Sequence, residues 1–471
     1  MQQIKTDICV IGAGSGGLSV AAGAVQMGAS VVLLEGHKMG GDCLNYGCVP
    51  SKALLAAAKQ AHAVTEGARL GVTSPAPTVD FAAAKDHVRR AIETIAPVDS
   101  EDRFRGLGVQ VIREYGRFIS PTQMQAGDHV ITARRFVIAT GSSPLVPPIK
   151  GLDTVPYLTN ETLFDDPERP EHLLIIGGGP IGLEMAQAHS RLGSKVTVVE
   201  GAKALGRDDA EAAVLVLQRL RDEGVTIIEG QQASRVSGSA GDIRLETEDG
   251  TTHSGSHLLV AVGRKVNIDR LDLDKAGVEH DRAVKVGEDL RSSNRRIYAV
   301  GDAAGGLQFT HVAGYHAGVV IRSMLFALPS KARTDHIPRV TYTDPELAQI
   351  GPTEAEARQQ HGQSVTVVRF DLAENDRAIA EDDRRGFVKV VIRRGRPIGA
   401  TIVGPGAGDQ IGLWAMAIAN NLKMSAVANT VLPYPTRGEA NKRAAGAYFS
   451  PKLFESSMVK GVVGLVQRLL P

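Results

Sequence analysis

The chain has 471 residues, of which 43% are hydrophobic, and it carries 52 glycines and a formal net charge of +1. This length suits about three domains, and no basic block indicates a nucleic-acid or membrane-binding patch. No apolar run approaches the roughly 18 residues of a membrane span, and three cysteines are too few for an extracellular disulfide scaffold. Met1 leads almost directly into an apolar strand, which leaves no room for a signal peptide and favours a cytoplasmic location.

The first predicted element is an apolar strand in which Cys9 is expected to be buried. A glycine loop containing Gly12, Gly14 and Gly17 follows, then a helix and a second apolar strand that ends at Glu35. In such a unit the glycines let the backbone approach a pyrophosphate at the helix N-terminus, and the acid accepts hydrogen bonds from an adenosine ribose. The pattern therefore predicts a dinucleotide site.

Two cysteines, Cys43 and Cys48, come directly after this unit. Five residues of ideal helix rise about 7.5 Å, whereas the Cα atoms of a disulfide are usually roughly 4.4–6.8 Å apart. The pair is therefore expected to close a disulfide only across a distorted helical turn, which Gly47 permits. A strained disulfide is easy to reduce, and the start of a helix stabilises a thiolate. The sequence predicts a redox-active dithiol beside the first dinucleotide.

Residues 172–200 repeat the pattern of residues 7–35 without a gap. The matching positions of the second copy are Gly177, Gly179, Gly182 and Glu200. The first copy adjoins the dithiol, so we expect its ligand to be a flavin, while the second copy is expected to bind the nicotinamide nucleotide. An acid at Glu200 disfavours a 2′-phosphate and predicts NADH, although Lys203 lies close by and leaves NADPH as the alternative.

These motifs resemble the pyridine nucleotide-disulfide oxidoreductases, specifically the dihydrolipoamide dehydrogenase and mercuric reductase branch. Further segments that carry the resemblance are residues 136–141, 261–264, 297–302 and 341–346. The resemblance implies an α/β fold with two Rossmann-like dinucleotide-binding domains, as in glutathione reductase, and an α+β C-terminal dimerisation domain. The implied boundaries are 1–150 for the first part of the FAD domain, 151–264 for the NAD(H) domain, 265–335 for a central segment completing the FAD domain, and 336–471 for the dimerisation domain.

The resemblance also implies roles for individual side chains. Cys43 would meet the substrate, while Cys48 would lie against the flavin and form the charge-transfer thiolate. Lys52 and Glu184 match a family ion pair beside the flavin, and we expect Glu184 in the first turn of the nicotinamide-site helix. The implied contacts to FAD and NADH are Gly12, Gly14, Ser15, Gly17, Glu35, Gly41, Lys52, Gly116, Thr140, Gly141, Asp302, Thr310, Gly177, Gly179, Ile181, Gly182, Glu200 and Gly263.

One segment departs from the dehydrogenase pattern. A histidine followed by a glutamate supplies the general base in dihydrolipoamide dehydrogenases, across the dimer interface, whereas here Tyr434 stands in place of the histidine before Glu439. All thirteen histidines fall at or before His361, so none is close enough in sequence to replace it. A phenol is mostly protonated at pH 7 and is a poor proton acceptor. Tyrosine there, together with Asp376-Arg377-Ala378, looks like mercuric reductases, yet no cysteine follows Cys48 to supply their C-terminal pair.

The sequence thus predicts a homodimeric flavoprotein that passes electrons from NADH through FAD to the Cys43–Cys48 dithiol. The acceptor is left open between a disulfide such as lipoamide, a thiol-bound metal ion such as Hg(II), and a quinone. A non-catalytic redox sensor or docking subunit is the alternative. We predict no resident metal site, no nucleic-acid partner and no transmembrane segment. The amphipathic tail 459–470 is expected to pack at the dimer interface, with weak membrane-surface contact as the alternative.

Overall fold

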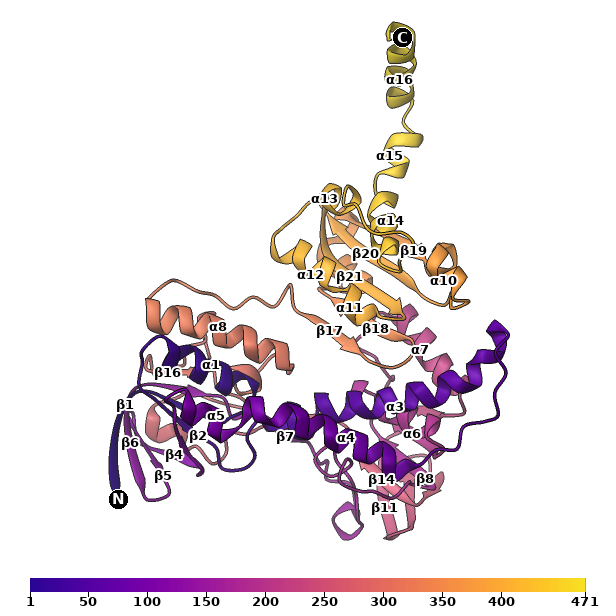
Figure 1. Cartoon of the computed structure of the whole chain (residues 1–471). Helices are drawn as coiled ribbons and strands as arrows, with labels where there is room; N and C mark the ends of the chain where they lie inside the picture. Colours follow the sequence, from indigo (N-terminus) through magenta and orange to yellow (C-terminus); the bar gives the residue numbers. More distant parts are fainter. Residues whose placement is uncertain (471) are drawn as a thin grey trace. The chain divides into compact units, whose positions relative to one another are not determined.

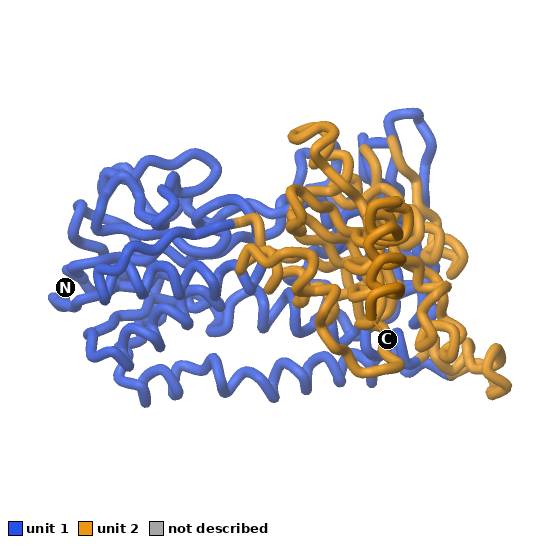
Figure 2. Tube along the Cα trace, turned by 90° about the horizontal axis from the view of Figure 1, so that it is seen from above, with its two compact units in different colours: residues 1–60, 78–201, 231–333 blue, residues 61–77, 202–230, 334–471 orange. Residues whose placement is uncertain are grey.

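The computed structural model describes residues 1–470 as two compact units. The first unit comprises residues 1–60, 78–201 and 231–333, and the second comprises residues 61–77, 202–230 and 334–471 (Figure 2). This division groups the chain differently from the four predicted segments, which stay predictions.

The first unit is built on a seven-stranded sheet in the order β3-β2-β1-β6-β5-β4, with β16 paired to β6 (Figure 1). Strand β6 is long enough for two neighbours on one side, because its first half pairs antiparallel with β5 and its last three residues pair parallel with β16. The strands of this sheet are β1 (Gln2–Ile11), β2 (Val31–Leu34), β3 (Gln110–Ile112), β4 (Gly116–Ser120), β5 (Gln123–Ala126), β6 (His129–Ile138) and β16 (Ile297–Ala299).

Strand β1 explains why its sequence is a continuous apolar run. Its partners β2 and β6 are parallel to it on both sides, and successive side chains of a strand point to opposite faces. Cys9 and Ile11 enter one hydrophobic core, while Ile8 and Val10 enter the core on the other face. A parallel central strand is buried on both faces, and Cys9 is fully buried, as predicted.

Three smaller sheets complete the first unit. Parallel strands run in the order β9-β8-β14, an antiparallel sheet follows the order β11-β12-β13, and β7 pairs with β15. These strands are β7 (Ser142–Pro144), β8 (His172–Ile176), β9 (Lys195–Glu200), β11 (Ala233–Ser239), β12 (Asp242–Thr247), β13 (Thr252–Gly255), β14 (His257–Val260) and β15 (Arg264–Val266). The helices are α1 (Ser15–Gln26), α2 (Gly41–Asn45), α4 (Phe81–Ile95), α5 (Glu101–Gly106), α6 (Pro180–Arg191) and α8 (Thr310–Phe326), with 3₁₀ turns η2 (Ala96–Asp99), η3 (Leu152–Thr154), η4 (Leu273–Ala276) and η5 (Gly301–Ala304). Helix α3 (Cys48–Glu66) begins in this unit and ends in the other.

The second unit contains a five-stranded antiparallel sheet in the order β17-β18-β21-β20-β19. Its core includes the fully buried Trp414, whose indole N–H donates to the Asn441 side chain over 2.7 Å. The strands of this sheet are β17 (Pro338–Thr341), β18 (Glu346–Ile350), β19 (Val365–Asp371), β20 (Phe387–Arg393) and β21 (Arg396–Gly404). Strand β10 (Thr226–Glu229) also falls in this unit but is not part of this sheet. The helices are α7 (Ala210–Asp222), α9 (Glu354–His361), α10 (Asp376–Ala380), α11 (Ala407–Gln410), α12 (Gly412–Ala419), α13 (Met424–Ala428), α14 (Glu439–Ala447), α15 (Ser450–Phe454) and α16 (Ser457–Leu469), with 3₁₀ turns η1 (Gly67–Leu70), η6 (Gly362–Ser364) and η7 (Leu372–Glu374).

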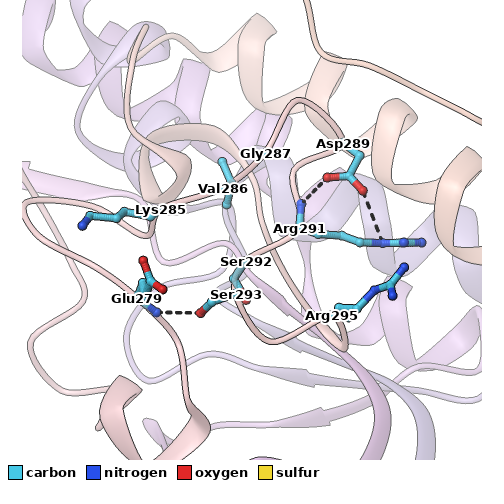
Figure 3. Close-up of a pocket in the computed structure, with 9 residues that line it drawn as sticks. All are labelled: Glu279, Lys285, Val286, Gly287, Asp289, Arg291, Ser292, Ser293 and Arg295. Atoms are coloured by element: carbon cyan, nitrogen blue, oxygen red, sulfur yellow. Dashed lines mark hydrogen bonds and ion pairs between the residues drawn. The ribbon is translucent and has the colours of Figure 1, made fainter.

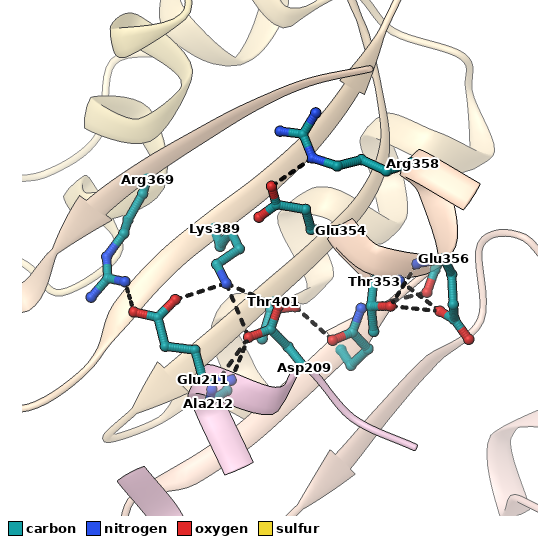
Figure 4. Close-up of polar contacts among 12 residues, drawn as sticks. Asp209, Glu211, Ala212, Thr353, Glu354, Glu356, Arg358, Arg369, Lys389 and Thr401 are labelled. Carbon is teal, nitrogen blue, oxygen red and sulfur yellow. Dashed lines mark hydrogen bonds and ion pairs between the residues drawn. The ribbon is translucent and has the colours of Figure 1, made fainter. Parts of the chain in front are cut away.

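A buried ion pair ties helix α7 to strand β20 within the second unit (Figure 4). The Lys389 ammonium lies 3.0 Å from both carboxylate oxygens of Asp209, and both residues are less than a tenth exposed. Asp209 also caps α7 by accepting from the backbone N–H of Glu211, whose own carboxylate contacts Lys389 and Arg369. Because each buried charge has a partner, neither is left uncompensated.

Candidate active site

The first glycine loop joins β1 to α1 and brings the backbone close to itself. Gly12 has φ +103°, and a Cβ on Gly17 would lie 1.9 Å from the Gly12 carbonyl oxygen. Gly41, from the dithiol segment, also lies against this loop, because its Cβ would come within 2.7 Å of the Gly14 Cα atom. Side chains at these positions would close the approach to the first turn of α1, which begins at Ser15 and holds no acidic residue.

Glu35, which follows β2, hydrogen-bonds to the backbone of this loop. Glu35 accepts the backbone N–H of Ala13 over 2.7 Å and that of His37 over 2.7 Å, each on a different carboxylate oxygen. An ionised carboxylate has about four acceptor sites, so these bonds leave capacity for ligand hydroxyls.

The second glycine loop repeats the geometry of the first between β8 and α6. Gly177 has φ +112°, and a Cβ on Gly182 would lie 2.0 Å from the Gly177 carbonyl oxygen. Glu200 accepts the Gly178 N–H over 2.7 Å, as Glu35 does from Ala13. Gly179 caps α6, and Ile181 is 39% exposed in the first turn of that helix. The repeat seen in the sequence is therefore a repeat of structure.

The dithiol spans a break between two helices. Cys43 lies in α2, Cys48 begins α3, and Tyr46 and Gly47 separate the two helices. A Cβ on Gly47 would lie 2.8 Å from the Asp42 carboxylate and 3.2 Å from the Asp42 carbonyl oxygen, so the connection between the helices is tight. The break agrees with the expected distortion between the cysteines. Both cysteines are free thiols here, hydrogen-bonded to each other.

The two sulfurs differ in acidity. The hydrogen bond from Cys43, assisted by the Thr310 hydroxyl and the charge of Lys52, lowers the pKa of Cys48 to about 6 despite burial. The same hydrogen bond between the two side chains, together with burial, raises the pKa of Cys43 well above its usual range. Cys48 is thus the thiolate of the pair at neutral pH, and thiolates are the reactive form of cysteine.

Residues far apart in sequence support this thiolate. The Thr310 hydroxyl lies 3.3 Å from the Cys48 sulfur, and Thr310 is the first residue of α8. The partial positive charge of a helix N-terminus stabilises an anion. The Ser15 hydroxyl, from the first glycine loop, lowers the pKa of Cys43 slightly against the larger rise. Ser15 and Thr310, predicted as cofactor contacts, also contact the dithiol.

Lys52 and Glu184 form an ion pair of 2.8 Å between α3 and α6. Glu184 is buried, with 4% of its surface exposed, and Lys52 lies one helical turn after Cys48. The predicted position of Glu184 in the first turn of α6 is wrong, because this helix begins at Pro180 and its first turn contains no acid. The second turn brings the carboxylate to Lys52.

A polar network surrounds Asp302, in the segment 297–302 that carries part of the resemblance. Ser142 donates to the Asp302 carboxylate over 2.5 Å and accepts from the Arg264 guanidinium over 2.7 Å. Arg264 also pairs with Asp42, beside the dithiol, at 3.0 Å. Burial raises the pKa of Asp302, although the Ser142 hydroxyl and Arg264 oppose that rise. Asp302 lies just after β16, and Ser142 begins β7 after β6, so neighbouring parallel strands bring them together.

These residues fit a flavin dinucleotide. The Thr140 hydroxyl is buried without a hydrogen-bond partner, at the carboxyl end of β6, and is available to a ligand. Gly41 and Gly14 form a cradle that a Cβ would fill, at the N-terminus of α1. Gly141 has φ +63° and open space beside it. FAD bound here would accept a hydride and then pass on its two electrons.

Two further predicted glycines have other reasons to be glycine. A Cβ on Gly116 would lie 2.6 Å from both Leu34 and Met124, so the position is limited by packing in the sheet. Gly263 has φ +140°, and its carbonyl accepts the Leu145 N–H over 2.9 Å. A strained backbone at the end of a strand suits a turn at a nucleotide site.

Tyr434 lies in the second unit, where its hydroxyl donates to the Asp376 carboxylate over 2.6 Å. This hydrogen bond and the charge of Asp376 raise the pKa of the phenol, and Glu439 adds to the rise. Tyr434 is 66% exposed, and Glu439 begins α14, 3.4 Å from Arg443. The phenol is therefore a donor already engaged with a carboxylate.

Asp376 is a hydrogen-bond partner of Tyr434 that the sequence did not predict. Its motif was noted, but not its contact with Tyr434, 58 residues later. Asn375 caps α10 through the Ala378 N–H and donates to the Thr436 carbonyl, which holds the two segments together. Arg437 adds a 2.7 Å ion pair to Glu381 at the end of α10. Only the fold reveals this pairing.

A pocket of about 440 Å³ in the first unit lies apart from the predicted site residues, since none of them lines it (Figure 3). Its charged lining residues are Glu279, Lys285, Asp289, Arg291 and Arg295. Asp289 accepts the Arg291 backbone N–H and lies 3.6 Å from its guanidinium. With both charge signs present, the pocket gives no clear ligand preference.

Residues 1–470 offer neither a clustered metal site nor a membrane-spanning helix. No group of three or more His, Cys, Asp or Glu side chains within this part could hold a metal ion. No helix described there is long and apolar enough to cross a membrane.

Residues 6–317 match the family described as pyridine nucleotide-disulphide oxidoreductase, and residues 337–445 match its dimerisation domain. A mercuric reductase from Streptomyces lividans is 35% identical over 94% of this chain and 96% of its own length. A dihydrolipoyl dehydrogenase from Geobacillus stearothermophilus is 32% identical over 94% of this chain and 96% of its own.

Solved structures are also similar. A Cu(II) complex of the HOCl-induced flavoprotein disulfide reductase RclA from Escherichia coli matches with a TM-score of 0.83 and 28% identity, over 93% of this chain and 99% of that chain. LpdA from Mycobacterium tuberculosis matches with a TM-score of 0.86 and 26% identity, over 95% and 99% of the two chains.

Proposed function

Because this chain belongs to the pyridine nucleotide-disulphide oxidoreductases, we propose that it is an NADH-dependent reductase whose dithiol delivers electrons to a thiophilic metal ion. The family predicted from the sequence is confirmed, as is the fold class of two dinucleotide-binding domains with a dimerisation domain. Members of the family use FAD and a pyridine nucleotide, so the protein is a flavoprotein oxidoreductase. NADH and the metal ion are our proposals.

The hydrogen bonding of Tyr434 is the observation on which we choose the electron acceptor. Oxidation of a dithiol substrate such as dihydrolipoamide requires a group that accepts a thiol proton, and general bases of this kind contribute roughly 10²–10⁴-fold. Asp376 holds the Tyr434 hydroxyl as a donor and raises its pKa, so this phenol does not serve as that base. A soft metal ion that binds the dithiol deprotonates the Cys43 thiol itself, and the proton leaves to water, so no protein base is required.

The thiolate itself supports a metal acceptor. Soft metal ions prefer thiolate ligands, and Cys48 is a thiolate at neutral pH, next to Cys43. The similar Escherichia coli reductase was solved as a Cu(II) complex, and several similar proteins are named mercuric reductases. Two electrons from one NADH would reduce one Hg(II) to Hg(0) or two Cu(II) to two Cu(I). The proposed roles are Cys43 as the sulfur that meets the acceptor and Cys48 as the sulfur beside FAD.

Glu200 supports NADH as the donor. It is fixed by the Gly178 N–H at the end of β9, the position that faces the adenosine ribose in this fold. A carboxylate there repels a 2′-phosphate. We expect Glu200→Ala to improve kcat/KM for NADPH relative to NADH, and a wild-type preference for NADPH would contradict this part of the proposal.

An NADH-oxidation screen tests the acceptor. The holoenzyme is assayed with Hg(II), Cu(II), lipoamide, glutathione disulfide and a soluble quinone, alongside Cys43→Ser and Cys48→Ser. We expect turnover with a metal ion that both variants lose, and slow turnover of lipoamide. Fast lipoamide or quinone turnover with none on metals would overturn the metal proposal. If NADH reduces the flavin but no acceptor reoxidises it, the result would favour a non-catalytic redox sensor.

A further inference from the structure

The C-terminal helix α16 has an apolar face that no described part of the chain covers. It begins after Ser456, whose hydroxyl accepts the Val459 N–H, and extends away from the five-stranded sheet of its unit (Figure 1). None of its residues is buried. Met458 is 78% exposed and Leu469 71%.

Apolar and polar residues separate cleanly around this helix. At 3.6 residues per turn, the apolar side chains span an arc of roughly 160°. This apolar face comprises Met458, Val459, Val462, Val463, Leu465, Val466 and Leu469. The opposite face holds Ser457, Lys460, Gly461, Gly464, Gln467 and Arg468.

We propose that α16 binds the surface of an anionic phospholipid bilayer, with its apolar face in the interface and its polar face toward the headgroups. Lys460 and Arg468 are the charged side chains between Ser456 and Leu470, and both are positive. A helix with a broad apolar face and lysine or arginine on its polar face lies in the plane of a membrane interface. Anionic headgroups attract such cations.

The width of the apolar face favours a bilayer over a second copy of the helix. A two-helix seam needs only a narrow stripe of apolar residues, and pairing would leave part of the roughly 160° arc in water. A planar interface covers the whole arc. This assignment differs from the dimer-interface packing expected from the sequence.

The composition of α16 also indicates that a covering surface stabilises it. Gly461 and Gly464 each disfavour helix by about 1 kcal/mol relative to alanine, and helices shorter than about 12–15 residues are marginal in water without packing. The helix has 13 residues. Burial of the apolar face would offset these costs.

Vesicle binding by the full-length holoprotein tests the proposal. Flavin absorbance is measured in the pellet after sedimentation with phosphatidylcholine vesicles, with and without phosphatidylglycerol. We expect binding to the anionic vesicles that weakens with salt. Lys460→Gln with Arg468→Gln should weaken it roughly 30-fold, from about 1 kcal/mol per cation. Val466→Asp should weaken it at least about 10-fold.

Gln467→Asp is the matched control, because it adds the same charge on the polar face next to Val466. It should weaken binding less than Val466→Asp does. Light scattering measures the oligomeric state of each form. Absence of wild-type binding, equal loss in both aspartate variants, or a change from dimer to smaller species in Val466→Asp without any vesicle binding would overturn the proposal. The last result would assign the face to a second copy of the chain.

Discussion

The Tyr434 hydroxyl donates a 2.6 Å hydrogen bond to the Asp376 carboxylate, which lies 58 residues earlier in the sequence. The phenol and the carboxylate belong to segments that Asn375 holds together through the Thr436 carbonyl. This pairing makes the tyrosine a fixed donor, whereas a histidine at the same position would be a base.

Replacing the phenol tests its role directly. Tyr434→His introduces a base with a pKa near 6.5 and should raise lipoamide turnover by about 10-fold or more. Tyr434→Phe should leave reduction of the flavin by NADH unchanged and slow only transfer to the acceptor. Stopped-flow flavin reduction and steady-state turnover measure the two steps. Rapid lipoamide turnover by the wild type would show that another group takes the proton.

Removal of the carboxylate should make the phenol more acidic. Asp376 raises the pKa of Tyr434 through its hydrogen bond and its negative charge, so Asp376→Asn should lower that pKa. The ultraviolet titration of each form, minus that of the same form carrying Tyr434→Phe, isolates this phenol. Glu374→Gln, which removes an exposed acid nearby, serves as the control. An unchanged titration in Asp376→Asn would mean that the hydrogen bond does not form in solution.

The reduced dithiol should react with alkylating reagents at unusually low pH. The Cys48 pKa of about 6 lies below the ordinary thiol value, so the thiolate persists as pH falls from 9 and is lost only below about 6. Alkylation of Cys48 by iodoacetamide, followed by mass spectrometry, should therefore show a midpoint near pH 6. Thr310→Val should raise the midpoint, because it removes a hydrogen bond to the sulfur, and Thr310→Ser should restore it. A midpoint above pH 8 in the wild type would contradict the assignment.

Substitutions in the two glycine loops should impair the binding of different cofactors. A methyl group on Gly17 would meet the Gly12 carbonyl oxygen, and one on Gly182 would meet that of Gly177, at nearly equal distances. We expect Gly17→Ala to lose FAD during purification. Gly182→Ala should keep FAD but show a raised KM for NADH of at least about 10-fold. Flavin content and steady-state kinetics distinguish the outcomes, and loss of FAD in Gly182→Ala alone would reverse the assignment of the two sites.

A buried histidine should make the protein sensitive to acid. Burial lowers the pKa of His189 to about 4, although its hydrogen bond to the Met185 carbonyl opposes that shift. The unfolded chain therefore binds a proton below pH 6.5 that the folded chain takes up only near pH 4. Stability should fall by about 1.4 kcal/mol per pH unit through this window. His189→Gln should flatten that slope in denaturant titrations, while His87→Gln on the exposed face of α4 should leave it unchanged.

The sequence by itself determined the elements whose cause is local. The spacing of Gly12, Gly14 and Gly17 recurs at Gly177, Gly179 and Gly182, so the two nucleotide loops could be predicted. In the structure Gly12 and Gly177 have positive φ, and Gly17 and Gly182 leave no room for a Cβ. The break at Gly47 followed from the distance between the two cysteines.

Tertiary structure decided the contacts whose partners are far apart in sequence. It brought Thr310 to Cys48 across 262 residues and Asp376 to Tyr434, and it placed Glu184 in the second turn of α6 rather than the first. It also left the apolar face of α16 exposed. Periodicity predicts that a helix has an apolar face, but only the packed chain determines whether another part of the protein covers it.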